Sequence, residues 1–229
     1  MEPEVDFAVL FARKKPEIRR TGTGEMVAEV LRQRISEGDL PPGTQLAEES
    51  LADSLQVSRN SLREAFRLLA HERLINHELH RGVFVRRLDR DDVLQVYTAR
   101  IFIEVAAVAN CPAGAAELRA ALAAVEQAEL LAREGRWMEV ATCNLAFHQS
   151  LVDSVGSRRV SEVMRQLLAE VRLAFHSMAD SRNFLEPYIP RNRQIVQLLS
   201  DGEAEQAATL MRAYLTDSRE QLYEALGLR

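Results

Sequence analysis

Three arginines recur at four-residue intervals in the stretch VSRNSLREAFR, at positions 59, 63 and 67. Residues four apart share one face of a helix, so this spacing predicts a row of guanidinium groups. A guanidinium is a planar, permanently charged fork of donors that suits phosphate and other planar acceptors. The opposite stripe of the same segment is apolar: Val57, Leu62, Phe66 and Leu69. The row is therefore either a surface for a polyanion or an ordinary solvated face, and its surroundings must decide.

The charge around these arginines is unlike that of the whole chain. The 229 residues carry a formal net charge of −5, yet the stretch 59–90 holds eight arginines against four carboxylates. A polyanion responds to the local field and not to the total, so the excess favours a nucleic-acid surface in this part of the chain.

The elements that would position the arginines can be predicted from apolar periodicity and turn residues. A helix over 24–37 ends before the Pro41-Pro42-Gly43 turn, and a short second helix covers 48–55. Ser58 is placed to cap a third helix that runs to about Arg73. Two β-prone runs around the turn HRG then predict a hairpin. This order of elements is that of a winged helix-turn-helix.

The rest of the chain is predicted to be helical. Breaker-rich connections separate six amphipathic segments, and their shortness favours an antiparallel bundle. The segments are 91–109, 113–134, 136–155, 157–179, 190–200 and 203–226. The fold class is therefore mainly α, a winged helix-turn-helix followed by an all-α bundle, with a short linker at 86–92.

Composition excludes several classes of protein. No apolar run approaches the ~18 residues of a membrane span, and the first residues do not form a secretory signal. Cys111 and Cys143 show no metal or disulfide spacing, which favours a reducing cytoplasm. No nucleophile elbow, P-loop or dinucleotide-binding glycine pattern occurs, so we expect no enzyme.

The stretch LPPGTQLAEESLADSLQVSRNSLREAFRLLAHERLI, followed by HRGVFV, resembles the DNA-binding region of the GntR family of bacterial transcription regulators. The remainder resembles the FadR-like (FCD) branch of that family in RIFIEVAA, NLAFHQSLVDSVGS and AATLMRAYL. The resemblance implies an N-terminal arm over 1–23, a DNA-binding domain over 24–88, and an effector-binding and dimerisation domain over 91–229.

The resemblance also implies which residues meet double-stranded DNA. The third helix would enter the major groove with its N-terminal end, and the wing tip would approach the minor groove. The residues predicted to contact DNA are Ser58, Arg59, Asn60, Ser61, Arg63, Arg81 and Gly82. Glu49 departs from the family, which often carries a basic residue there, and a phosphate contact is expected to be lost or shifted.

In the second domain, many members of this branch bind a divalent metal with Asp-x-x-x-His and two later histidines. The matching positions here are Asn144, His148, Asn192 and Tyr214, so three of four ligands are replaced by weak neutral donors. We therefore predict no metal cofactor. A polar pocket of these four residues and Arg100 would suit an organic acid or acyl effector. Two alternatives stay open: His148 as a core histidine, and Arg100 paired with Glu104.

The sequence thus predicts a ligand-responsive transcription regulator that binds a pseudo-palindromic operator as a homodimer. Of the two signs of regulation, repression is the one predicted. One alternative is a constitutive DNA-binding protein with a degenerate sensor domain, and another is a metal-dependent sensor. A helical-bundle metalloenzyme fused to a DNA-binding module is a further rival, which the missing Glu-x-x-His pairs disfavour.

Overall fold

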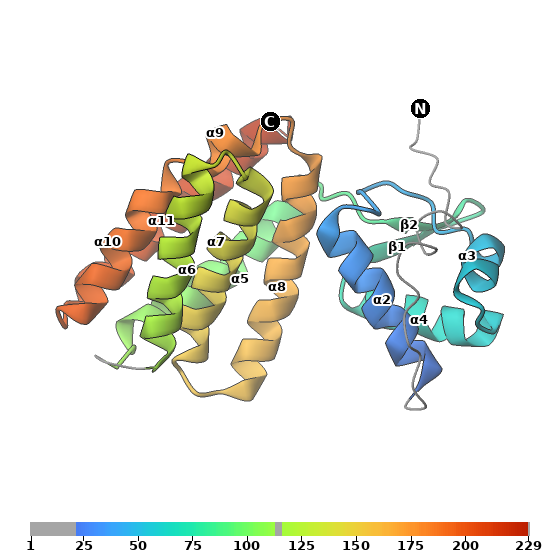
Figure 1. The fold of residues 1–229 in the computed structure, drawn as a ribbon, viewed down its shortest axis with the longest axis horizontal. Helices are drawn as coiled ribbons and strands as arrows, with labels where there is room; N and C mark the ends of the chain where they lie inside the picture. The colour runs from blue at the N-terminus through green and yellow to red at the C-terminus, as the bar shows by residue number, and fades with distance from the viewer. Residues whose placement is uncertain (1–21, 113–115, 229) are drawn as a thin grey trace. The chain divides into compact units, whose positions relative to one another are not determined.

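The computed structural model describes residues 22–112 and 116–228. The chain divides into two compact units between Arg87 and Leu88. Helices dominate both units, and the one sheet of the described residues is a two-stranded hairpin in the first unit (Figure 1). The predicted fold class is confirmed. All but the last two residues of the predicted 1–23 arm lie outside the described residues.

The first unit has three helices and the hairpin in the predicted order. Its elements are α2 (Thr23–Glu37), α3 (Glu48–Leu55), α4 (Arg59–His71), β1 (Ile75–Glu78) and β2 (Gly82–Val85). Leu62, Phe66 and Leu69 bury the apolar stripe of α4. Burial of that stripe fixes which face of α4, the one bearing the arginines, remains in solvent.

The connection between α3 and α4 is tight because its residues adopt specific backbone conformations. Gln56 ends α3 in the left-handed region, with φ 55°. Ser58 is extended, and its Oγ accepts a hydrogen bond from the amide of Ser61 at 3.1 Å, the N-cap predicted from the sequence. The cap places the first turn of α4, with Arg59, at the surface.

The hairpin pairs β1 and β2 in antiparallel register, with Ile75 opposite Val85 and Glu78 opposite Gly82. Its turn places Gly82 at φ 109°, a conformation that favours glycine. Gln45 donates a hydrogen bond from Nε2 to the backbone oxygen of Arg81 at 2.7 Å. This contact ties the tip of the wing to the segment before α3.

The second unit contains seven helices within residues 88–112 and 116–228, one more than predicted. They are α5 (Arg90–Ala109), α6 (Ala116–Arg133), α7 (Trp137–Asp153), α8 (Arg158–Ser177), α9 (Ser181–Leu185), α10 (Tyr188–Ser200) and α11 (Ala204–Ala225). Helix α9 lies in a segment that its Pro and Asn residues had marked as a loop. Asp180 caps it by accepting from the amide of Asn183, and Phe184 and Leu185 bury its apolar side.

Helix α5 packs against α7, α8 and α11 within this unit. It begins at Arg90, which corrects the predicted linker of 86–92. Asp89 and Asp92 form a capping box, in which each side chain accepts from the other residue's amide. Linker residues therefore start the helix.

The described helices include none that is both long and apolar enough to cross a membrane.

Replacement of Ser58 by alanine should loosen the start of α4. Loss of an N-cap costs about 1 kcal/mol, which corresponds to a roughly fivefold faster opening of the first turn. Hydrogen–deuterium exchange of the amides in 59–66 measures it. Asn60→Ala is the matched control, because Asn60 is exposed in the same turn and takes no part in the hydrogen bonds of the cap. Equal acceleration in both variants would contradict the capping role.

Candidate functional site

The N-terminal turns of α4 present polar side chains to solvent. Ser58, Arg59, Asn60 and Arg63 are exposed, and Ser61 is half-buried. The guanidinium-bearing side chains of Arg59 and Arg63 keep 60% and 63% of their area accessible. Such a helix end, with solvent-accessible side chains around backbone N–H groups, matches what a major-groove reader needs.

A groove with a volume of ≈ 550 Å³ runs between α4 and the hairpin. The polar side of α4 contributes Asn60, Arg63 and Arg67 to its lining, and the hairpin contributes His77 and Gly82. Five of the seven predicted DNA contacts lie on α4 or its cap, and the groove joins α4 to the glycine of the wing. The first unit therefore brings the predicted residues to neighbouring places.

Two carboxylates of α3 bind the arginines of α4. Glu49 Oε1 lies 2.6 Å from Arg59 Nη2, and Glu48 Oε1 lies 2.8 Å from Arg63 Nε. The sequence indicated only that Glu49 would disfavour a phosphate contact. Its direct pairing with Arg59 depends on the angle between α3 and α4, which no spacing rule supplies.

Arg81 lies in the turn of the wing and contacts both strands of the hairpin. Its guanidinium forms an ion pair with Glu78 and lies 5.2 Å from the centroid of the Phe84 ring. The side chain keeps 58% of its area exposed, so it remains accessible from solvent.

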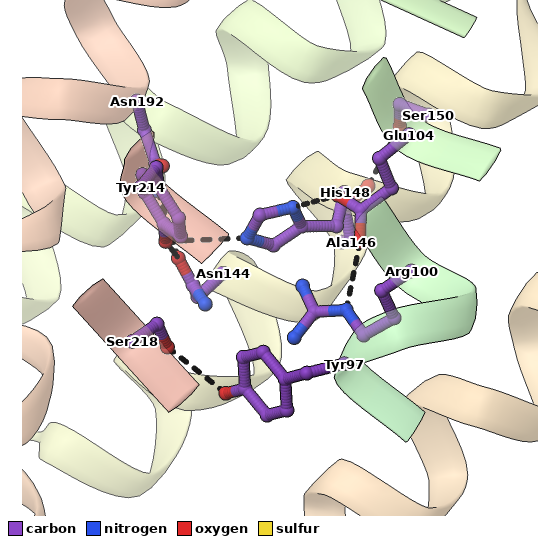
Figure 2. Close-up of polar contacts among 10 residues, drawn as sticks. All are labelled: Tyr97, Arg100, Glu104, Asn144, Ala146, His148, Ser150, Asn192, Tyr214 and Ser218. Carbon is purple, nitrogen blue, oxygen red and sulfur yellow. Dashed lines mark hydrogen bonds and ion pairs between the residues drawn. The ribbon is translucent and has the colours of Figure 1, made fainter. Parts of the chain in front are cut away.

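The second unit encloses a polar cluster centred on Glu104, whose side chain has no accessible area (Figure 2). One carboxylate oxygen accepts from Arg100 Nε at 2.7 Å, one helical turn away. The other oxygen contacts Nδ1 of His148, which is equally buried on α7. The pairing of Arg100 with Glu104, one of the two open alternatives, is the arrangement found.

The four positions that match the family's metal ligands meet beside this group (Figure 2). His148 Nε2 lies 3.2 Å from the Tyr214 hydroxyl, which lies 3.1 Å from Oδ1 of Asn144. The same Oδ1 accepts from Nδ2 of Asn192 at 2.8 Å. These atoms are hydrogen-bonded to one another, whereas Oδ1 of Asn192 has no hydrogen-bond partner among the described residues.

A divalent metal does not fit this set of side chains. Two amides and a phenol are weak neutral ligands, and the phenol proton is held more firmly than usual because burial raises the pKa of Tyr214 well above 10. Within residues 22–112 and 116–228, no three His, Cys, Asp or Glu side chains gather as a metal site would require.

Counting donors and acceptors links the protonation of His148 to the orientation of the Tyr214 hydroxyl. When neutral His148 donates from Nδ1 to Glu104, its Nε2 is an acceptor and needs the single proton of the Tyr214 hydroxyl. When that proton turns to Asn144, as in the hydrogen bond from Tyr214 to Oδ1, Nε2 is left without a donor unless it carries a proton of its own. One proton therefore serves two acceptors, and the choice between them is coupled to the charge of His148.

Burial and the fixed charges set the direction of each titration. Burial lowers the pKa of His148 and outweighs the neighbouring Glu104 carboxylate, so the ring is neutral near pH 7. Burial opposes ionisation of Glu104, yet Arg100 and then His148 outweigh it and hold the pKa of the carboxyl below its usual range. The cluster therefore holds one cation and one anion.

Sequence reasoning missed two members of this neighbourhood. The hydroxyl of Tyr97 lies 2.9 Å from Oγ of Ser218, and the Arg100 guanidinium lies 5.0 Å from the centroid of the Tyr97 ring. Tyr97 stands three residues before Arg100, so helical spacing could have placed both on one face. Ser218 carried no signal, because it is a single serine on a long amphipathic helix.

Comparison with known proteins identifies both units. A model of the FCD domain matches residues 95–217, and a model of bacterial regulatory proteins of the gntR family matches residues 23–85. The chain belongs to the GntR family. Its relatives are transcriptional regulators, and the expected resemblance is confirmed.

Three similar proteins illustrate the match. The GntR-family chain is 28% identical to a protein of Paenarthrobacter nicotinovorans described as a D-xylose utilization operon transcriptional repressor, over 83% of this chain and 84% of that one. It is 31% identical to an HTH-type transcriptional regulator of Streptomyces ambofaciens, over 81% and 78%. A solved GntR transcriptional regulator from Rhodococcus sp. RHA1 is 36% identical, with a TM-score of 0.84, over 90% and 99%.

Acidification should destabilise the FCD domain of this GntR regulator through His148. The folded state holds the pKa of His148 below its ordinary value of 6.5, so the unfolded chain binds more protons once the pH falls below that value. Stability contributed by the neutral ring is complete above pH 6.5 and is lost toward the folded pKa. Thermal melting followed by Trp137 fluorescence between pH 7.5 and about 5 measures it.

His148→Gln should reduce this pH dependence, because glutamine keeps a polar group but does not titrate. His77→Gln is the control, since His77 is exposed on the wing. A pH dependence of melting that is the same in wild type and His148→Gln would show that other groups cause it.

Proposed function

We propose that this GntR-family protein is a cytoplasmic transcriptional repressor that binds a pseudo-palindromic operator as a homodimer and responds to a small organic acid. The observation that carries the DNA-binding part is the exposed N-terminal end of α4. There Arg59, Asn60 and Arg63 stand free of the core beside a glycine-bearing wing. Repression is supported by the similarity to the Paenarthrobacter relative, which is described as a transcriptional repressor.

The DNA contacts divide by chemistry. Arg59 is suited to the O6 and N7 acceptors of guanine, a bidentate contact worth about 1–3 kcal/mol of discrimination. Ser58, Asn60 and Ser61 offer short donors and acceptors beside it, and Arg63 lies one turn further along the same face. Arg81 and Gly82 are proposed to approach the minor groove, where the absence of a side chain allows close contact.

Two such units are needed for a palindromic site, because one winged helix reads one half-site. Self-association through the FCD domain is supported by exposed apolar side chains on α5. Phe102 and Leu94 keep 76% and 43% of their area accessible, and they lie eight residues apart on the same helix.

The effector is proposed to bind at the buried cluster. Arg100 uses Nε for Glu104, and the terminal nitrogens of its guanidinium point toward Asn144 and Tyr97 (Figure 2). Oδ1 of Asn192 is buried without a hydrogen-bond partner among the described residues, so it can accept from a hydroxyl group or a water molecule. A carboxylate that also carries a hydroxyl matches both features.

Arg59→Ala should abolish specific DNA binding while the fold is retained. The side chain is exposed, and its one ion pair is at the surface, so its loss removes base contacts with little effect on stability. Selection from a randomised duplex library, followed by fluorescence anisotropy on the enriched duplex, should give a loss of at least about tenfold. Arg158→Ala, at a 92% exposed side chain of the FCD domain, is the control. Unchanged binding by Arg59→Ala would refute the proposed role of α4.

Neutralising the buried ion pair should abolish the response to organic acids. In a thermal-shift panel of hydroxy acids and dicarboxylates, a ligand at 100 times its Kd stabilises the folded state by about 2.7 kcal/mol. The double variant Arg100→Met/Glu104→Gln keeps the volume without a lone buried charge, so it should fold and lose that shift. Glu104→Gln alone leaves the Arg100 cation without its counter-ion and should increase anion affinity. A shift that persists in the double variant would place the effector elsewhere.

A further inference from the structure

Helix α3 begins with two acidic residues that face the start of α4. Glu48 and Glu49 lie in its first turn, where the positive end of the helix dipole stabilises a carboxylate. Glu48 belongs to the sequence pattern that the chain shares with its family. Glu49 forms an ion pair with Arg59, a residue proposed to contact DNA, so this pair belongs to the proposed DNA interface.

This ion pair adds little to the stability of the fold. The side chain of Glu49 is 77% exposed and that of Arg59 is 60% exposed, and exposed pairs are screened by water and salt. Neither side chain packs in the core of the first unit. The ion pair is therefore expected to affect how Arg59 interacts with DNA.

The carboxylate affects phosphate contacts and base contacts differently. Binding to DNA of any sequence depends on how many phosphates the protein neutralises, and an arginine paired with a carboxylate offers no net charge for that purpose. Reading guanine depends instead on two directed N–H groups. The contact with Glu49 engages Nη2, one nitrogen of a guanidinium that carries five N–H donors, so the fork can still bind a base edge.

We propose that Glu49 is a specificity-determining residue of the DNA interface. Its carboxylate neutralises Arg59 and thereby lowers the affinity for non-cognate DNA. The same contact orients the guanidinium toward a base. The inference depends on the proposed DNA-binding function. It adds that Glu49 increases the discrimination against non-cognate DNA. The ratio of specific to non-specific affinity, and not affinity alone, decides which DNA sites a regulator occupies.

Asp53 provides a control on the same helix. It lies four residues after Glu49 and is also exposed, so it occupies the same face of α3 one turn away. Asp53→Asn and Glu49→Gln each remove one negative charge from this face. A general effect of charge would appear in both variants, and an effect of pairing with Arg59 appears in Glu49→Gln alone.

The experiment measures the binding of wild type, Glu49→Gln and Asp53→Asn to two duplexes over a range of salt concentrations. One duplex is the sequence that wild type enriches from a randomised library, and the other is its scrambled version. Glu49→Gln should bind the scrambled duplex about fivefold more tightly, with a salt dependence steeper by about 0.9 for each freed arginine. Affinity for the enriched duplex should change less than about twofold, so the specificity ratio falls.

A second variant separates charge from orientation. Glutamine at position 49 still offers an oxygen to Arg59, whereas alanine does not. Glu49→Ala should therefore also bind the scrambled duplex more tightly, and in addition relax the base preference at the position that Arg59 reads.

Three results would overturn the inference: equal gains on both duplexes, equal effects of Glu49→Gln and Asp53→Asn, or a loss confined to the enriched duplex. Failure of wild type to enrich any duplex would instead refute the proposed function, so the two failures are distinguishable.

Discussion

The carboxylate of Glu104 is the constraint around which the FCD domain is arranged. A buried charge costs several kcal/mol unless each of its oxygens is bound, and here one oxygen takes Arg100 and the other takes His148. These partners come from α5 and α7, and Tyr214 extends the chain of contacts to α11. Glu104 thus connects α5 to α7, His148 connects α7 to α11, and the apolar core packs around these contacts.

The two units use arginine for opposite purposes. Arg100 is shielded from water, and its charge is compensated within the fold, so it contributes a fixed cation that only an entering ligand can use. Arg59 is open to water, and its compensating carboxylate is equally open, so a stronger polyanion can compete for it. The depth of burial explains this difference. An Arg–Glu ion pair at the surface is screened by water and salt, whereas a buried one is costly to break.

The fold could be predicted from the sequence where turn and capping residues agreed with the apolar periodicity. The N-cap at Ser58, the wing and the long amphipathic helices follow from turn residues and apolar spacing, and all were found. Helix α9 was missed because it is five residues long, too short for a period to be visible. The capping box at Asp89 was not predicted, because residues 86–92 were predicted to form a linker.

The candidate site was predictable only in part, for a physical reason. The family resemblance predicted that four residues would lie together: Asn144, His148, Asn192 and Tyr214. The hydrogen-bond partner of each atom, however, depends on how the helices are rotated and how deeply each side chain is buried. The i,i+4 spacing of Arg100 and Glu104 allowed their pairing, while nothing in the spacing indicated that His148 would complete it. Likewise, the contact between Glu49 and Arg59 depends on how α3 meets α4.

The replacement of metal ligands by amides and a phenol changes how such a domain can respond to a signal. A metal would fix these four positions whether or not a ligand is present, whereas here the hydrogen bonds of Asn144 and Tyr214 are exchangeable at small cost. A ligand that binds Arg100 acts on α5, whose first residue follows directly on the segment that leaves β2. A ligand can shift a balance between two arrangements of the domain only to the extent that it binds one of them more tightly. An effector that binds here must replace the mutual hydrogen bonds of the cluster. Its own contacts must therefore be at least as favourable as the hydrogen bonds that it breaks.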